Sequence, residues 1–247
     1  MLPFLTNECL FPSVETALIE PDGLLCAGAD LSPNRLISAY SKGIFPWYSD
    51  GEPILWWSPN PRTIFDIANY NPSKSLCRFA RKSEWKITLN NAFEEVIQAC
   101  AEPRSDLDGT WITNDIIEAY NELHKKGYAH SIEIWQDSPL KKRRLIGGIY
   151  GVAIGKLFCG ESMFSRESQA SKIAISCLIR YLDGFDFPIL DAQIKNPHLS
   201  TLGSKQIERE SFIKIINNQI IRSNDETIWQ PKELNMKELV TRIVIEK

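Results

Sequence analysis

Apolar residues along the chain follow helical spacing in some segments and strand spacing in others. Asp30 or Ser32 can cap a helix in which Pro33 takes a first-turn position, and Gly43 ends that helix. Apolar residues then recur every three or four positions in further segments, which predicts helices over residues 91–101, 113–126, 168–182 and 209–218. Alternating or continuous apolar residues predict strands over residues 131–135, 145–154, 157–163, 187–194 and, near the end, 239–245.

The order of these elements predicts an α+β fold. Gly155 and Lys156 separate two predicted strands and are typical of a tight hairpin turn. The helix over 168–182 leads to the strand over 187–194, whose apolar flanks indicate an internal position in a sheet. A hairpin, a helix, a strand and a helix in this order predict a mixed sheet flanked by helices, with one helix crossing between two neighbouring strands.

A polar segment divides the chain into two expected domains. Residues 66–75, with the sequence DIANYNPSKS, lack the apolar spacing of a helix or strand. We therefore expect a small N-terminal domain over residues 1–65 and a larger domain over residues 66–247.

Residues 43–62, here called the aromatic segment, have the sequence GIFPWYSDGEPILWWSPNPR. Four prolines exclude a regular amphipathic helix, because proline fixes its own φ and restricts the preceding residue. Trp47, Trp56 and Trp57 fall in this stretch. Their rings suit either a stiff platform on which a flat ligand stacks or the core of a small domain, and the segment alone does not separate the two interpretations.

Composition excludes several classes of protein. The net charge of −3 gives no general attraction to nucleic acid, so such a contact needs a local basic patch. Six cysteines without a CxxC pair and three histidines do not form a metal-binding pattern, and we expect no metal. The first residues do not resemble a signal peptide, and the most apolar stretch is short and contains Lys156. We expect a cytoplasmic protein with reduced cysteines and no membrane span.

Two short strings carry candidate chemistry. In FCGESMFSR, Glu161 lies among apolar residues, which indicates either a structural salt bridge or a contact to a ligand. In LDAQIKNPH, Asp191 and Gln193 are two apart on a predicted strand and share one face, with Asn196 just beyond. Such alternation also occurs on a polar edge strand, but apolar residues on both flanks favour an internal strand and therefore a site.

The chain resembles the leucyl/phenylalanyl-tRNA–protein transferases, which are bacterial aminoacyltransferases of the N-end rule. The resemblance covers most of residues 11–203, in the order and roughly the spacing of the family. It rests on the strings GLLCAGADLSPNRLISAYSKGIFPWY (23–48), PILWWSPNPR (53–62), GTWIT (109–113), HSIEIW (130–135), GGIYGVAIGKLFCGESMFSR (147–166) and LDAQIKNPHLSTLG (190–203).

The resemblance implies an acetyltransferase-like (GNAT) fold for the larger domain, and it implies a reaction. Leucine or phenylalanine passes from the 3′ end of its tRNA to a protein that begins with Arg or Lys, and the new N-terminus marks that protein for degradation. The preference among leucine, phenylalanine and methionine stays open. An aminoacyl ester is already activated, so we expect neither a cofactor nor a metal. The expected partners are aminoacyl-tRNA and the acceptor protein, and nothing in the sequence demands an oligomer.

The resemblance also implies roles for individual residues. Those matching the family's contacts to the terminal adenosine of the tRNA are Tyr40, Trp47, Trp111 and Tyr120. Those matching the substrate pocket are Glu161, Met163, Leu190 and Asn196. Asp191 and Gln193 match the catalytic centre, where Asp191 would take the proton of the incoming amine directly or through Gln193. Proton transfer assisted by the substrate is the alternative.

Two basic strings are candidates for tRNA phosphate contacts. The first contains Lys74, Arg78, Arg81 and Lys82 and follows the expected domain boundary, close in sequence to the aromatic segment. The second covers residues 141–144. Either string also fits an ordinary solvated surface. We favour the first string for the phosphate contacts.

Two other functions fit part of the sequence. An acyl-CoA-dependent N-acetyltransferase needs a turn whose backbone approaches a pyrophosphate closely, usually with glycines, but the turn SRESQAS at 165–171 has none. A non-catalytic RNA-binding module would explain the aromatic and basic residues. It would not explain an inward pair of Asp191 and Gln193.

Overall fold

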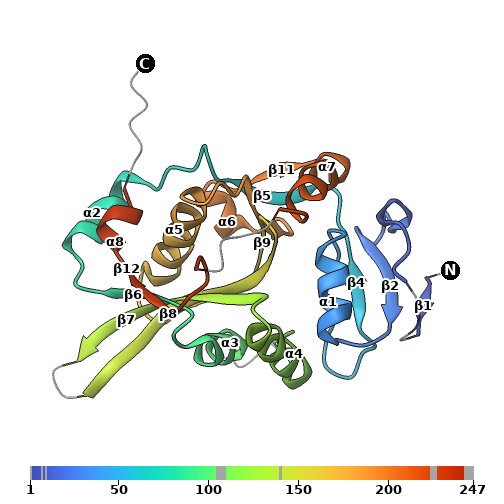
Figure 1. The fold of residues 1–247 in the computed structure, drawn as a ribbon, viewed down its shortest axis with the longest axis horizontal. Coiled ribbons are helices and arrows are strands. Elements are labelled where there is room, and N and C mark those ends of the chain that lie inside the picture. The colour runs from blue at the N-terminus through green and yellow to red at the C-terminus, as the bar shows by residue number, and fades with distance from the viewer. Residues whose placement is uncertain are drawn as a thin grey trace.

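The computed structural model describes residues 2–6, 8, 10–103, 110–138, 141–222 and 227–241. Its strands form a four-stranded sheet and an eight-stranded sheet, accompanied by α-helices, so the expected mixed α+β class is confirmed. Figure 1 shows the small sheet with α1 at one end of the molecule and the large sheet filling the rest.

The small sheet has the strand order β1-β2-β4-β3. Its strands are β1 (Phe4–Leu5), β2 (Leu24–Gly28), β3 (Phe45–Pro46) and β4 (Leu55–Trp57). A short 3₁₀ helix covers Val14–Thr16, and α1 covers Pro33–Tyr40. As predicted, α1 begins at Pro33 after Ser32. The chain turns at Gly43 with a φ of 73°, a conformation that glycine adopts without strain.

The large sheet has the order β11-β5-β10-β9-β8-β7-β6-β12. Its strands are β5 (Arg62–Asp66), β6 (Lys86–Leu89), β7 (Ala129–Ser138), β8 (Lys141–Ile154), β9 (Leu157–Ser165), β10 (Ile189–Gln193), β11 (Lys205–Ile207) and β12 (Lys232–Leu234). Neighbouring strands are antiparallel except β9 and β10, which are parallel. β10 is internal, between β5 and β9, as its apolar flanks predicted.

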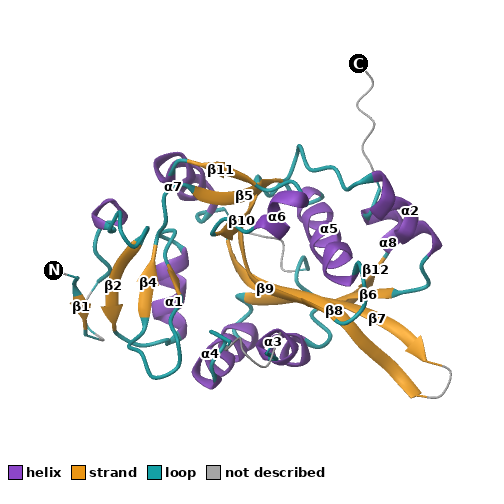
Figure 2. Cartoon of the chain, turned by 180° about the vertical axis from the view of Figure 1, so that it is seen from behind, coloured by secondary structure: helices purple, strands orange, loops and turns teal. Residues whose placement is uncertain are grey.

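Helices cover both faces of the large sheet (Figure 2). They are α2 (Lys74–Lys82), α3 (Phe93–Ala101), α4 (Asn114–Lys125), α5 (Ala170–Asp183), α6 (Pro197–Thr201), α7 (Arg209–Gln219) and α8 (Met236–Leu239). One apolar core contains the buried residues of α3 and α4 together with α1, and a second contains those of α5, α2 and α8. The sheet therefore separates two cores, each closed by its own helices.

The crossover predicted from the sequence is confirmed. α5 connects β9 to β10, and these strands pair in parallel, Leu190 opposite Phe158. α5 is buried from Ala170 to Leu182 apart from Lys172, because it packs on the sheet strands β7, β8 and β9. The hairpin between β8 and β9 turns at Gly155, where φ is 55° and a Cβ would lie 2.3 Å from the carbonyl oxygen of Gln219. Only glycine permits that approach.

The structure corrects some local predictions. β5 belongs to the large sheet and spans the expected boundary at residues 65 and 66, so the chain changes sheets before Arg62. The division into two domains stays a prediction. The expected strand over 239–245 is wrong at its start, because Leu239 ends α8; residues 242–245 lie outside the described residues. The sequence did not predict the strands of the small sheet, the strands β5, β6, β11 and β12 of the large sheet, or the helices α2, α6 and α8.

Candidate active site

A cavity of about 940 Å³ lies where β9 and β10 run side by side, between β3 and the start of α5. It brings together residues from distant parts of the sequence. The predicted site residues that line it are Trp47, Trp111, Glu161, Met163, Leu190, Gln193 and Asn196. The predicted residues Tyr40, Tyr120 and Asp191 are not among its lining.

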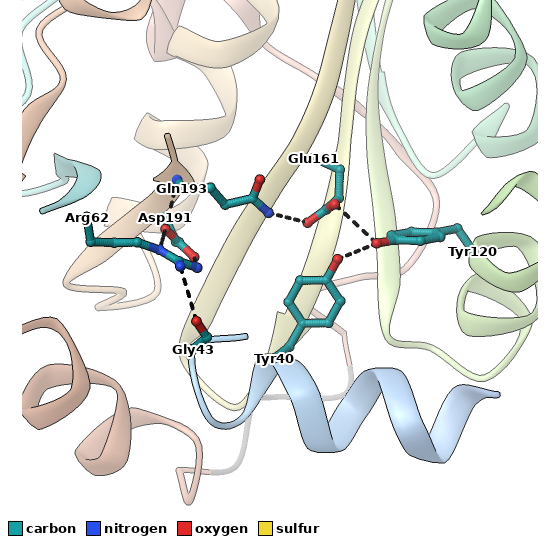
Figure 3. A network of polar contacts seen from close by, with 7 residues as sticks. All are labelled: Tyr40, Gly43, Arg62, Tyr120, Glu161, Asp191 and Gln193. Carbon is teal, nitrogen blue, oxygen red and sulfur yellow. Dashed lines mark hydrogen bonds and ion pairs between the residues drawn. The ribbon is translucent and has the colours of Figure 1, made fainter. Parts of the chain in front are cut away.

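Glu161 on β9 is the centre of a hydrogen-bond network (Figure 3). Its Oε1 accepts from Gln193 Nε2 at 2.8 Å, and its Oε2 accepts from Tyr120 Oη at 3.1 Å. Burial raises the pKa of Glu161 to about 7, and the nearby Asp191 carboxylate also raises it, against the hydrogen bonds from Tyr120 and Gln193, which lower it. A carboxyl group with such a pKa exchanges a proton near neutral pH.

Tyr40 and Tyr120 support this carboxylate from inside the protein. Both rings are fully buried where α1 packs on α4, and burial raises both hydroxyl pKa values well above their ordinary range, so both groups are neutral. Tyr120 gives its only hydroxyl hydrogen to Glu161, so Tyr40 donates to Tyr120 Oη. Buried rings offer no face for stacking, and the expected place of these two tyrosines around the terminal adenosine stays a prediction.

Asp191 is fully buried in an ion pair that the sequence analysis missed. Arg62 donates from Nε to Oδ1 at 2.8 Å and from Nη2 to Oδ2 at 2.7 Å, a two-pronged contact. Asp191 Oδ1 also accepts from the backbone N–H of Gln193 at 2.9 Å. Because this carboxylate is enclosed, the expected direct proton transfer from a substrate amine to Asp191 does not fit its position. The two partners are 129 positions apart in the chain, which no local pattern reveals.

Gln193 reaches the cavity through an irregular end of β10. The pairing of β10 with β5 shifts register between Asp191 and Gln193, and Gln193 has a φ of 61°. Such a bulge redirects a side chain at the end of a strand. Alternation along a regular strand predicted a shared face for the two residues; instead, the side chain of Gln193 extends to Glu161 while Asp191 faces Arg62 (Figure 3).

The aromatic segment combines both interpretations left open by the sequence. Trp56 has no exposed surface, donates from Nε1 to the carbonyl oxygen of Gly28 at 2.9 Å, and belongs to the core with Phe45. Trp47 is 42% exposed and lines the cavity. Trp57 fixes the backbone of Trp47, because the Nε1 of Trp57 donates to the carbonyl oxygen of Trp47 at 2.6 Å. One ring of the segment is therefore presented at the cavity and another fills the core.

The predicted phosphate-binding residues lie away from this cavity. Lys74, Arg78, Arg81 and Lys82 are exposed on α2, which packs on α5 and α8 at the opposite end of the molecule from α1 (Figure 1). They are close to the aromatic segment in sequence but not in space, because β5 carries the chain away from the small sheet, and their contact with tRNA phosphates stays a prediction. The cations at the cavity are Arg166, Lys172 and Lys195, of which Arg166 is paired with Glu102. The sequence did not indicate these three cations as a group, because they are separated along the chain and form no basic run.

A second buried carboxyl group supports α3, whose end lines the cavity. Glu133 on β7 has no exposed surface and accepts hydrogen bonds from Thr88 Oγ1, Ser131 Oγ and the backbone N–H of Asn91. Burial raises its pKa to about 7, although these hydrogen bonds oppose the shift. In the folded protein it therefore holds a proton in a pH range where an unfolded chain has released it.

This shift predicts the effect of Glu133→Gln on stability. The folded state binds more protons between pH 4.5 and about 7, so the free energy of unfolding falls as pH rises through that window. The variant should remove up to about 3 kcal/mol of this dependence, leaving the part due to Glu161. Urea unfolding at about pH 5 and pH 8 measures it, with the exposed Glu122→Gln as control. An unchanged pH dependence in Glu133→Gln would contradict the buried proton.

In the described ranges, no group of three or more His, Cys, Asp or Glu side chains is arranged to hold a metal ion. The same part of the chain contains no helix with the length and apolar character needed to cross a bilayer.

Known proteins resemble this chain along most of its length. Residues 64–217 match the family model of leucyl/phenylalanyl-tRNA protein transferase, and residues 29–60 match the model of that family's N-terminal domain. The leucyl/phenylalanyl-tRNA–protein transferase of Shewanella denitrificans (strain OS217) is 47% identical over 235 residues, covering 95% of this chain and 98% of the relative. That of Shewanella baltica (strain OS155) is 50% identical over 236 residues, covering 94% and 97%.

These matches extend along nearly the whole chain and include the strands that carry Glu161 and Gln193. The chain belongs to the leucyl/phenylalanyl-tRNA–protein transferase family and is an aminoacyltransferase.

Proposed function

We propose that this protein transfers leucine or phenylalanine from aminoacyl-tRNA to the N-terminal Arg or Lys of acceptor proteins. The observation that carries the proposal is the cavity in which two aromatic rings, the exposed Trp47 and the partly buried Trp111, lie beside the hydrogen-bonded pair Glu161 and Gln193. The rings suit the terminal adenosine, where stacking contributes about 1–3 kcal/mol per base. Met163 and Leu190 provide apolar lining for the side chain that is transferred.

Glu161 is proposed to receive the attacking amine. An α-amino group has a pKa of about 7.7–8.0, so most of it is protonated at neutral pH and must lose a proton before it attacks. The Glu161 carboxylate lines the cavity and has a pKa of about 7, which suits both binding an ammonium and accepting its proton. Proton transfer to a group of the substrate is the alternative route.

The reaction then needs little more than correct positioning. The amine nitrogen attacks the ester carbonyl carbon, a C–N bond forms, the ester C–O bond breaks, and the ribose oxygen takes up a proton as it leaves. Holding the two reactants together lowers the barrier by several kcal/mol, on the order of 7–11 for ideal alignment. Gln193 orients Glu161 through its amide. Asn196 caps α6 with its Oδ1, so a contact to substrate would come from its amide nitrogen.

The fate of the product, the cellular location, the fold of the larger unit and the oligomeric state are part of this proposal. The product carries a new N-terminal residue and would be marked for N-end rule degradation, in the cytoplasm. The larger unit is proposed to have the GNAT fold. Its support is the β8–β9 hairpin followed by α5 and by β10 parallel to β9. We further propose that the protein acts as a monomer.

A transfer assay tests the function directly. We expect label to pass from radiolabelled leucyl-tRNA or phenylalanyl-tRNA to a protein that begins with Arg or Lys, and not to the same protein beginning with Asp. The rate should be unchanged after dialysis against EDTA and without ATP. Labelling from acetyl-CoA instead would support an N-acetyltransferase, and tRNA binding without any transfer would support an RNA-binding module. Either result would reject the proposed function.

A salt titration tests where tRNA phosphates bind. Lys172 and Lys195 line the cavity, so we expect a Lys172→Ala/Lys195→Ala variant to reduce the slope of log affinity against log salt by about 1.4–1.8. The quadruple alanine variant of Lys74, Arg78, Arg81 and Lys82 tests the other candidate patch in the same way. An unchanged slope in either variant would exclude that group from phosphate contact. Lys125→Ala, which removes an exposed surface cation, is the control.

A further inference from the structure

Arg62 lies at the point where the chain passes from the small sheet to the large one. It is the first residue of β5, shortly after β4 ends at Trp57, and it is 1% exposed. Its guanidinium is enclosed between the rings of Phe45 and Phe212, at 4.8 and 4.6 Å from their centroids. A cation this deeply buried requires partners, and Arg62 has them on two sides.

One side of the guanidinium holds the end of β10. Nε and Nη2 bind both oxygens of Asp191, and Asp191 Oδ1 in turn accepts from the backbone N–H of Gln193. This contact lies where the register of β10 shifts and Gln193 takes a positive φ. Asp191 thus ties the bulge to Arg62. The orientation of Gln193 toward Glu161 depends on that bulge.

The other side of the guanidinium contacts the segment that carries Trp47, which forms another wall of the cavity. Nη1 donates to the carbonyl oxygen of Gly43 at 3.1 Å. Gly43 immediately precedes the stretch in which Phe45, Pro46 and Trp47 line the cavity. The ring of Phe45 also covers the guanidinium, so this wall contacts Arg62 through both backbone and side chain.

We propose that Arg62 is a positioning residue that fixes the wall carrying Trp47 relative to Gln193. Arg62 does not line the cavity, so it acts through Gly43 and Asp191. The planar fork is required, because lysine carries the same charge but cannot bind two carboxylate oxygens and a carbonyl in one plane. The inference rests on the proposed function, since it assigns Trp47 and Gln193 to the two reactants.

The test uses Arg62→Lys, Asp191→Asn and their combination in the full-length chain. With pre-bound leucyl-tRNA, well below the melting temperature, Arg62→Lys should lower the single-turnover rate per folded molecule about 10²-fold, as expected for misplaced groups. The Michaelis constant for leucyl-tRNA should also rise. Asp191→Asn keeps an acceptor for the Gln193 N–H and should lose a similar factor. The single-turnover rate of the double variant should fall no further than that of the slower single variant, because both changes break the same Arg62–Asp191 contact.

Controls separate this role from a purely structural one. Lys205→Met removes the exposed ion pair with Asp66 at the other end of β5 and should change the rate less than twofold. If Arg62→Lys does not fold, Asp191→Asn alone carries the test through its rate per folded molecule. A wild-type rate in the folded single variants would overturn the inference, as would losses that multiply in the double variant. Absence of transfer by the wild-type protein would instead reject the proposed function.

Discussion

Gln193→Ala should lower the single-turnover rate of aminoacyl transfer about 10²–10⁴-fold, the usual effect of losing a group that positions acid–base chemistry. The side chain donates to Glu161 Oε1, the carboxylate proposed to receive the attacking amine. Without it, Glu161 keeps the hydrogen bond from Tyr120 but loses the one that orients it within the cavity. The affinity for leucyl-tRNA should change far less, because Trp47 and Trp111 remain.

Rapid quenching of the enzyme with pre-bound labelled leucyl-tRNA measures that rate, and filter binding measures the affinity. Gln206→Ala is the matched control, since Gln206 is exposed on β11, next to β5. A Gln193→Ala variant that transfers leucine at the wild-type rate would remove Gln193 from the mechanism. A variant that fails only through weaker tRNA binding would place Gln193 in recognition instead.

Trp47→Ala should weaken the use of aminoacyl-tRNA and Trp56→Ala should weaken the fold, although the two tryptophans lie in one aromatic segment. Trp47 is 42% exposed at the cavity, so its loss should raise the Michaelis constant for aminoacyl-tRNA by the value of one stacking contact, about 1–3 kcal/mol or 5- to 150-fold. Its melting temperature should stay nearly unchanged. Trp56 has no exposed surface, so its loss should lower the free energy of unfolding by about 3–5 kcal/mol.

Thermal unfolding and transfer kinetics of both variants check this contrast. Trp47→Phe, which keeps a smaller ring, should fall between the wild type and Trp47→Ala in its Michaelis constant. A large loss of melting temperature in Trp47→Ala with unaltered kinetics would identify Trp47 as a core residue. Weaker tRNA binding by a stably folded Trp56→Ala would contradict the division of the segment into a presented ring and a buried one.

Features that depend on neighbouring residues could be predicted before the structure was known. The helices α1, α3, α4, α5 and α7 and the β8–β9 hairpin follow from apolar spacing and turn residues. The crossover from β9 through α5 to β10 follows from the order of those elements. The motifs of the family also led to some of the residues that line the cavity, Glu161 and Gln193 among them.

Contacts between distant segments determine which of these residues line the cavity. Asp191 is enclosed by Arg62, 129 positions earlier in the chain, and the rings of Tyr40 and Tyr120 are buried where α1 packs on α4. Short edge strands such as β11 carry too few residues for a period to emerge, so they depend on the neighbour they pair with. Local spacing reports which side chains share a face of one element. Burial and ion pairing depend on what another element places against that face, and this is set by contacts between residues far apart in the chain.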